Sequence, residues 1–275
     1  MKKFAVLGVL LLGLALAGAG AVADALYVAF IAKVPAVAPK VASLEEAYRV
    51  QDAFVARLSV PLGPVVGYKV GLTSQAVQKR FGVDHPLRGQ LLAGMLLRNG
   101  AEVPARFGAR PIAEADLLVR VRDAGINEAK TIAEVWEHLD AVIPFIELPD
   151  LLVRKGGPLT APVITAINVG ARLGVMGAEI PTERLAAGDL AAMNVRVYLG
   201  GEEVMAVPGK AILGHPLNAV LWLVRDLKAD GKALKPGDLV SLGSLGRPLV
   251  PRPGTELRVV YAGLFGNQEV RVRFR

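Results

Sequence analysis

The chain has 275 residues, with 32 Lys and Arg against 25 Asp and Glu, 53% apolar residues and no cysteine. That length and apolar content support one large folded domain with a substantial core, and they exclude a disordered chain. The absence of cysteine excludes disulfides, thiolate metal sites, iron–sulfur clusters and cysteine nucleophiles.

Residues 1–23 have the pattern of an export signal. Lys2 and Lys3 precede an uncharged apolar run that ends in the small-x-small triplet Ala21-Val22-Ala23, just before Asp24. We therefore expect a cleaved signal peptide at 1–23, a single domain at 24–275 and export to the periplasm. An uncleaved membrane anchor is the alternative, because about 20 apolar residues can span a bilayer. If the segment is not a signal, the protein is cytoplasmic.

The charge balance is positive, with a formal net charge of +7. The densest basic pattern, Arg271 to Arg275, alternates with apolar residues, which indicates the solvent face of a terminal strand. Because the basic residues do not cluster, we predict no nucleic-acid partner. The positive balance favours a small anionic substrate instead.

The N-terminal part of the domain, about 24–62, is predicted to be helical. Ser43 and Glu46 form a capping box, and apolar residues then recur at helical spacing as far as Leu58. A similar pair, Thr131 with Glu134, predicts a short helix that extends through Leu139.

The C-terminal half is predicted to be rich in strands. The stretch 194–199 alternates apolar and polar residues before Gly200-Gly201, and 257–274 repeats this hairpin pattern. One helix interrupts these strands, with Pro216 in its first turn and Gly231 beyond its end. Helices and strands do not alternate regularly, so we predict an α+β fold and not a Rossmann fold or an α/β barrel.

Acidic side chains form the first candidate site. Glu114 and Asp116 lie at i and i+2 in an extended segment, which places both on one face, and Glu147 lies in a strongly apolar stretch. Two carboxylates about 4 Å apart repel each other by roughly 4 kcal/mol at an effective dielectric of 20. A divalent cation such as Mg²⁺ or Mn²⁺ would relieve that repulsion. The alternative is a solvated strand face together with one paired buried acid.

Lys69 is the second candidate, because it lies in a largely apolar segment between Gly67 and Gly71. A buried lysine requires an acidic partner or a lowered pKa, and either suits a catalytic site. The alternative is a lysine that extends its ammonium group from a strand edge into solvent.

A collinear series of short segments then points to one family. They are AYRVQ (47–51), GYKVGLTS (67–74), AVQKRFGVDHP (76–86), AEAD (113–116), FIELPD (145–150), AINVGARLG (166–174), GHPLNAVLWL (214–223) and GDLVSLGSLG (237–246). In this order they resemble the 2-oxopent-4-enoate (2-hydroxypentadienoate) hydratases of the fumarylacetoacetate hydrolase superfamily. The resemblance covers most of the chain after the signal.

The resemblance implies a mixed β roll with accessory N-terminal helices. We also expect the protein to form a homo-oligomer. The resemblance also implies a divalent metal, Mg²⁺ or Mn²⁺, held by Glu114, Asp116 and Glu147, which chelates a small 2-oxo acid. Lys69 matches a lysine that supports proton transfer.

The same resemblance implies residues that contact the substrate. Asn168 matches an asparagine near the substrate, and we expect Ser74 and Ser244, which lie in matching segments, to contact it as well. Two positions depart from the family pattern. Leu87 stands where relatives carry an acid, and Ile167 stands where they tend to carry aspartate.

The lost acid at Leu87 bears on catalysis, because leucine cannot move protons. We assign Asp84 as the catalytic candidate that would take the role of this acid. The function expected from the resemblance is hydration of a 2-hydroxy-dienoate or 2-oxo-enoate acid. Decarboxylation or C–C hydrolysis of a related 2-oxo acid is one alternative, and an exported, non-catalytic ligand-binding protein on the same scaffold is another.

Overall fold

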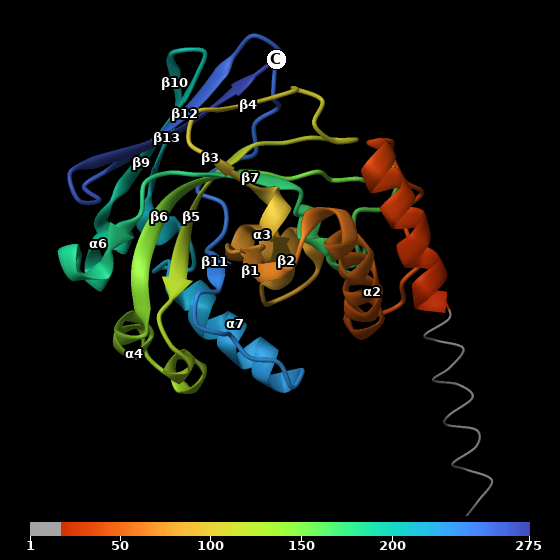
Figure 1. Ribbon diagram of the computed structural model, residues 1–275, viewed down its shortest axis with the longest axis horizontal. Coiled ribbons are helices and arrows are strands. Elements are labelled where there is room, and N and C mark those ends of the chain that lie inside the picture. Colours follow the sequence, from red (N-terminus) through yellow and green to blue (C-terminus); the bar gives the residue numbers. More distant parts are fainter. Residues whose placement is uncertain (1–17) are drawn as a thin grey trace, which may run out of the picture.

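The computed structural model describes residues 18–275 and shows strands with helices packed around them (Figure 1). Most of the predicted signal, residues 1–17, lies outside the described residues. The strands of this part of the chain form two sheets, of eight and five strands. The prediction of an α+β fold is confirmed.

The larger sheet contains both parallel and antiparallel pairs. Its main order is β2-β1-β11-β5-β6-β7-β3, and β8 pairs with β6 beside this path. The bounds are β1 Val65–Gly71, β2 Leu87–Leu92, β3 Leu96–Arg98, β5 Glu114–Val121, β6 Leu139–Leu148, β7 Leu173–Met176, β8 Ile180–Pro181 and β11 Leu239–Ser241. Strands β1 and β11 run parallel, whereas β5 pairs antiparallel with both β11 and β6.

The smaller sheet contains the two predicted hairpins. Its order is β10-β9-β12-β13-β4, with bounds β4 Ala101–Val103, β9 Asn194–Leu199, β10 Glu202–Pro208, β12 Glu256–Ala262 and β13 Asn267–Phe274. Val195 and Val197 of β9 are fully buried, as the alternating pattern predicts. The basic residues of β13 lie on its exposed positions, as expected for a solvent face.

The main core joins the two sheets and helix α7 (Asn218–Ala229). Tyr261 of β12 is fully buried, and its hydroxyl donates to Phe145 O at 2.7 Å and accepts from Phe145 N at 3.1 Å. This contact fixes the smaller sheet against β6 close to the acidic residues described below. Helix α7 begins at Asn218, two residues later than predicted, because His215 and Pro216 form a turn in which Asn218 N bonds to His215 O at 2.9 Å.

Two long helices pack against each other beside the larger sheet (Figure 1). Residues 18–32 are helical, and α2 spans Leu44–Leu62 with Ser43 as its N-cap, as the capping box predicts. Ala19 and Ala23 of the first helix are buried against apolar residues of α2. Residues 18–23, the described end of the predicted signal, are therefore part of a packed helix.

The remaining helices are short: α3 Gln75–Phe81, α4 Ile132–Glu137, α5 Ala161–Ala166 and α6 Ala187–Ala192. Thr131 caps α4 as predicted, but the helix ends at Glu137, and Leu139 already belongs to β6. The apolar residue at 139 therefore faces the core from a strand. Of the helices that the structure describes, none has both the length and the apolar character needed to cross a bilayer.

Candidate active site

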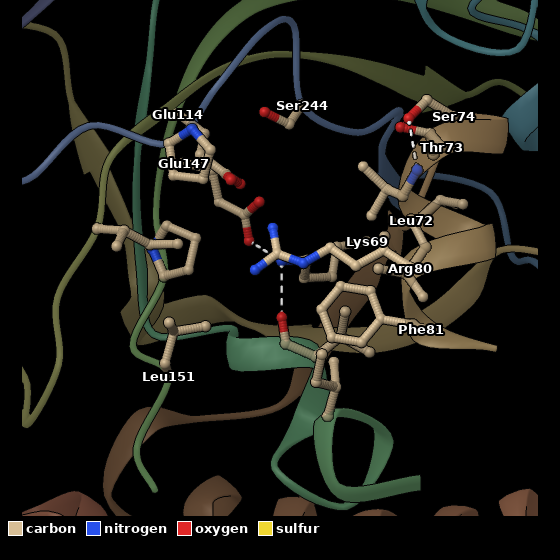
Figure 2. A pocket seen from close by; sticks show the side chains of 18 of the residues that line it. Lys69, Leu72, Thr73, Ser74, Arg80, Phe81, Glu114, Glu147, Leu151 and Ser244 are labelled. Atoms are coloured by element: carbon tan, nitrogen blue, oxygen red, sulfur yellow. Dashed lines mark hydrogen bonds and ion pairs between the residues drawn. The ribbon is translucent and has the colours of Figure 1, made fainter. Parts of the chain in front are cut away.

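A cavity of about 310 Å³ opens where β1, α3, β5 and β6 meet (Figure 2). We call it the active-site cavity. Its lining is mostly apolar, with a few charged and hydroxyl side chains. Those polar residues are Lys69, Thr73, Ser74, Arg80, Glu114, Glu147 and Ser244. A partly enclosed, mainly apolar space with few polar groups is typical of a small-molecule site.

The pairing of β5 with β6 brings the predicted acids together. Glu114 lies directly opposite Glu147 in the ladder, and Asp116 lies two residues farther along β5. Alternate residues of a strand share a face, so the three carboxylates lie on one side of the sheet. Asp116 is fully buried and Glu147 is only 3% exposed. Glu114 is partly buried, so the solvated strand face of the alternative interpretation is wrong. The paired buried acid of that interpretation is present, because Glu147 forms an ion pair with Lys69.

This grouping makes the charged forms unfavourable. Burial first, and then the neighbouring Glu147 carboxylate, raise the pKa of Glu114 from 4.5 to about 8, although Lys69 opposes the shift. Burial and Glu147 likewise raise the pKa of Asp116 from 3.8 to about 7. The acids thus form a coupled group that would be stabilised by additional positive charge.

Asp116 is held away from the cavity by three hydrogen bonds. Its carboxylate accepts from Leu117 N at 2.6 Å, from Gly243 N at 2.9 Å and from the Ser241 hydroxyl. Within residues 18–275, no three acidic or histidine side chains are already arranged as a metal-ligand set. The donor chemistry nevertheless fits Mg²⁺ or Mn²⁺, because the group consists of carboxylate oxygens with an excess of negative charge. Metal binding therefore requires a change of carboxylate orientation.

Lys69 of β1 is the buried cation of the site. It is 3% exposed, its ammonium group donates to Val169 O at 2.9 Å, and it forms an ion pair with Glu147 (Figure 2). The alternative of a lysine that extends into solvent is therefore wrong. Val169 has φ 50°, an unfavourable conformation for a β-branched residue, and in it the carbonyl faces Lys69.

The other predicted site residues are divided between the cavity and its surroundings. Ser74 and Ser244 line the cavity. Asn168 is fully buried, but its side chain bonds the backbone of Gln90, accepting from its N at 2.7 Å and donating to its O at 2.8 Å. Asn168 therefore positions β2, and the structure does not bring its amide into the cavity.

The structure does not bring Asp84 to the site either. Asp84 is exposed in the turn that precedes β2 and is not among the residues that line the cavity. Leu87 is fully buried in an apolar cluster with Ile164 and Val169. Packed apolar side chains thus fill the place where relatives carry the acid. The prediction that Asp84 takes over the role of that acid has no geometric support.

The sequence patterns did not predict two polar residues of the cavity. Thr73 is buried, and a Cβ added at Gly243 would lie 2.3 Å from its hydroxyl oxygen, so Gly243 permits this close packing. Arg80 is exposed on α3 and lines the cavity. Both lie within matching segments, but neither has a sequence pattern that distinguishes a cavity residue from a surface residue.

No protein-family model matches the chain. The chain is 35% identical over 215 residues to the TodF product hydratase of Pseudomonas putida F1, a match that covers 78% of each protein. It is 33% identical over 228 residues to 2-keto-4-pentenoate hydratase 2 of Dechloromonas aromatica, covering 82% of this chain and 85% of that protein.

Among solved structures, 4-oxalocrotonate decarboxylase from Pseudomonas putida G7, complexed with magnesium and adipate, superposes with a TM-score of 0.82 and 25% identity. The superposition covers 96% of this chain and 98% of the decarboxylase.

Proposed function

Because the chain belongs to the 2-keto-4-pentenoate hydratase family, we propose that it is a divalent-metal-dependent hydro-lyase that hydrates a small 2-oxo-enoate acid. The observation that carries this proposal is the buried Lys69–Glu147 pair with Glu114 beside it at the edge of the active-site cavity. Such an arrangement of coupled, buried ionisable groups is typical of a catalytic site.

We propose Glu114, Asp116 and Glu147 as the residues that would hold Mg²⁺ or Mn²⁺. When bound, the ion supplies Lewis acidity toward the carboxylate and 2-oxo oxygens of the substrate. The magnesium complex of the structurally similar decarboxylase supports this choice of metal. The raised pKa values of Glu114 and Asp116 provide an independent reason, because a divalent cation favours their ionised forms.

Lys69 supplies the second positive charge of the proposed site. Val169 O fixes its ammonium group in a buried position, where it can stabilise negative charge that develops on the 2-oxo oxygen. Thr73 and Ser74 offer hydroxyl groups along the same cavity that can orient the water to be added. Hydration places hydrogen on one carbon of the double bond and hydroxyl on the other, and Lys69 is the proposed group for proton movement.

The apolar packing of Leu87 favours two competing functions. Without an acid there, a decarboxylase or C–C hydrolase reaction of the same superfamily is one candidate, and the similarity to 4-oxalocrotonate decarboxylase supports it. The other candidate is an exported ligand-binding protein that retains the scaffold and lacks turnover.

Product analysis distinguishes these functions. With Mg²⁺ and freshly generated 2-hydroxypenta-2,4-dienoate, we expect a product with all its carbon atoms and one new hydroxyl, and we expect EDTA to abolish its formation. Release of CO₂ or of a shorter acid from a panel of 2-oxo acids would assign a lyase or hydrolase reaction instead. Metal-dependent binding without turnover of any panel member would identify the binding protein.

We also propose that the protein is exported after cleavage behind Ala23. The apolar N-terminal pattern supports this, and N-terminal sequencing of the mature protein is expected to begin at Asp24. Cleavage there removes the buried Ala19 and Ala23 from the contact with α2. Recovery of intact Met1 would contradict cleavage.

We further propose that the protein forms a homo-oligomer. Val28, Ile31 and Val34, on and just after the N-terminal helix, are 64%, 47% and 50% exposed, respectively. Neighbouring exposed apolar side chains of this kind are typical of protein contacts. Light scattering of the purified protein measures the oligomeric state, and a monomeric mass would contradict this part.

A further inference from the structure

Three successive residues between α5 and β7 have left-handed backbone conformations. Asn168, Val169 and Gly170 have φ of 57°, 50° and 74°, and we call them the left-handed turn. Glycine adopts this region freely and asparagine tolerates it, whereas a β-branched residue such as Val169 is strained there. Strain of this kind persists only where the surrounding structure enforces it, and it is concentrated at functional sites.

The left-handed turn presents its central residue to Lys69. Val169 lines the active-site cavity, and its carbonyl accepts a hydrogen bond from the Lys69 ammonium group at 2.9 Å. An ammonium group has three N–H donors, and Val169 O and the Glu147 carboxylate are its two partners here. Because Lys69 is only 3% exposed, its direction depends on where the turn holds the Val169 carbonyl.

Asn168 fixes the left-handed turn to the strand beside Lys69. Its side chain accepts from Gln90 N at 2.7 Å and donates to Gln90 O at 2.8 Å, as a neighbouring strand would do. Asn168 is fully buried and is not among the residues that line the cavity. Gln90 belongs to β2, in which Gly89 lies directly opposite Lys69 of β1. These two bonds therefore join the turn to the strand pair that carries Lys69.

Two glycines of this strand pair leave the space that the left-handed turn occupies. A Cβ added at Gly89 would lie 2.6 Å from Asn168 O and 3.0 Å from Lys69 Cγ. A Cβ added at Gly71 would lie 2.6 Å from Val169 Cγ1. Neither glycine has a positive φ, so close approach of another segment explains both of them. The position of the Val169 carbonyl is thus enforced from the strands as well as by Asn168.

We propose that Asn168 is a positioning residue, which holds the left-handed turn so that the Val169 carbonyl fixes the direction of the Lys69 ammonium group. This inference rests on the proposed function, because it assumes that Lys69 is the group that moves protons. Asn168 acts without touching the substrate. Its contribution is preorganisation, because a reacting group must be held close to its productive geometry by the residues around it.

A purely structural role for Asn168 predicts a different result. A side chain that only joins two segments contributes to the stability of the domain, and its loss has no particular effect on Lys69. Asn127 is the matched case, because its side chain accepts from Leu234 N and donates to Leu234 O, both at 2.9 Å. It does not line the cavity. Asn127→Gly therefore removes the same pair of bonds away from the site.

Amine labelling of Lys69 tests the inference without any turnover. The metal-free protein is treated with a limiting amount of acetic anhydride, and mass spectrometry measures the labelling of Lys69 relative to the exposed Lys79. We expect Asn168→Gly to raise this ratio about tenfold, the scale of losing the net contribution of one hydrogen bond to local opening. Glycine adopts a φ of 57° without strain, so the variant removes only the side-chain bonds. Asn127→Gly should leave the ratio unchanged.

Hydration kinetics give a second measurement. We expect Asn168→Gly to lower kcat about tenfold while KM changes by less than about twofold, because the groups that bind the substrate are retained. Asn127→Gly should keep both constants. Asn168→Asp keeps the acceptor for Gln90 N and loses the donor to Gln90 O. It is the milder variant, and it should raise the labelling ratio less than Asn168→Gly does.

The two measurements separate this inference from the proposed function. An unchanged Lys69 ratio in Asn168→Gly and Asn168→Asp, an equal increase in Asn127→Gly, or a fall in kcat shared by Asn127→Gly would overturn the role of Asn168. Thermal unfolding of each variant verifies that the labelled protein is folded. If the wild type hydrates no 2-oxo-enoate, the proposed function fails, whereas the labelling ratio still decides whether Asn168 positions Lys69.

Discussion

Lys69→Met is expected to lower kcat/KM for hydration by about a thousandfold, the scale of losing a general acid–base group and a charge that stabilises the transition state. The variant retains the length and apolar part of the side chain but removes the ammonium group held by Val169 O and Glu147. Steady-state kinetics, followed by the loss of absorbance of the conjugated dienol, measures the effect.

The same substitution leaves a buried acid without its cation. Glu147 is 3% exposed, so the removal of Lys69 leaves its carboxylate buried and unpaired, which lowers the free energy of unfolding. Thermal unfolding is therefore measured in parallel, and Lys79→Met on the exposed side of α3 is the control for the loss of a lysine. A folded Lys69→Met protein with more than a tenth of wild-type activity would rule out the assigned role of Lys69.

Glu114→Gln is expected to weaken Mg²⁺ binding by about a hundredfold, because one of three proposed charged ligands becomes a neutral amide. Titration calorimetry of the metal-free protein measures the affinity directly and does not depend on turnover. Glu137→Gln, at an exposed position of α4, is the matched control and should bind Mg²⁺ like the wild type. Unchanged affinity in Glu114→Gln would remove this carboxylate from the metal site.

Glu114→Gln should weaken Mg²⁺ binding but stabilise the metal-free protein. The folded-state pKa of Glu114 is raised from 4.5 to about 8, so the folded protein retains a proton that the unfolded chain has lost. Its stability therefore falls as the pH rises from about 4.5 to 8. At pH 8, Glu114→Gln should be more stable than the metal-free wild type, on the order of 1–3 kcal/mol after allowance for partial solvent screening.

Chemical denaturation at several pH values measures this difference. Added Mg²⁺ should stabilise the wild type at pH 8 and have little effect on Glu114→Gln, which links the two halves of the prediction. A metal-free wild type whose stability does not fall between pH 5 and 8 would show that the carboxylates do not destabilise one another as the structure indicates.

Local signals predicted much of the fold correctly. The caps at Ser43 and Thr131 depend on hydrogen bonds to residues three positions away, and the two C-terminal hairpins depend on alternation and turn glycines. These features are set by neighbouring residues, so they can be read without knowledge of the whole chain. The end of the helix at 131–139 was predicted too late, because an apolar residue fits both a helix and the start of a buried strand.

The candidate site was predictable only in part. The i, i+2 spacing of Glu114 and Asp116 indicated a shared face, and the apolar context of Glu147 indicated burial. The sequence pattern did not reveal that Asp116 is bound by Ser241 and Gly243, because these contacts join residues more than a hundred positions apart. It also did not reveal that Asp84 lies outside the cavity.

By itself, the sequence determined the family, the α+β class and the identity of the charged residues available for chemistry. The tertiary structure decided which of them meet: Lys69 with Glu147 and with Val169 O, 100 residues away, and Arg80 beside the same cavity. Patterns of spacing report the local geometry of a helix or strand, whereas burial and charge pairing depend on which distant segments pack together.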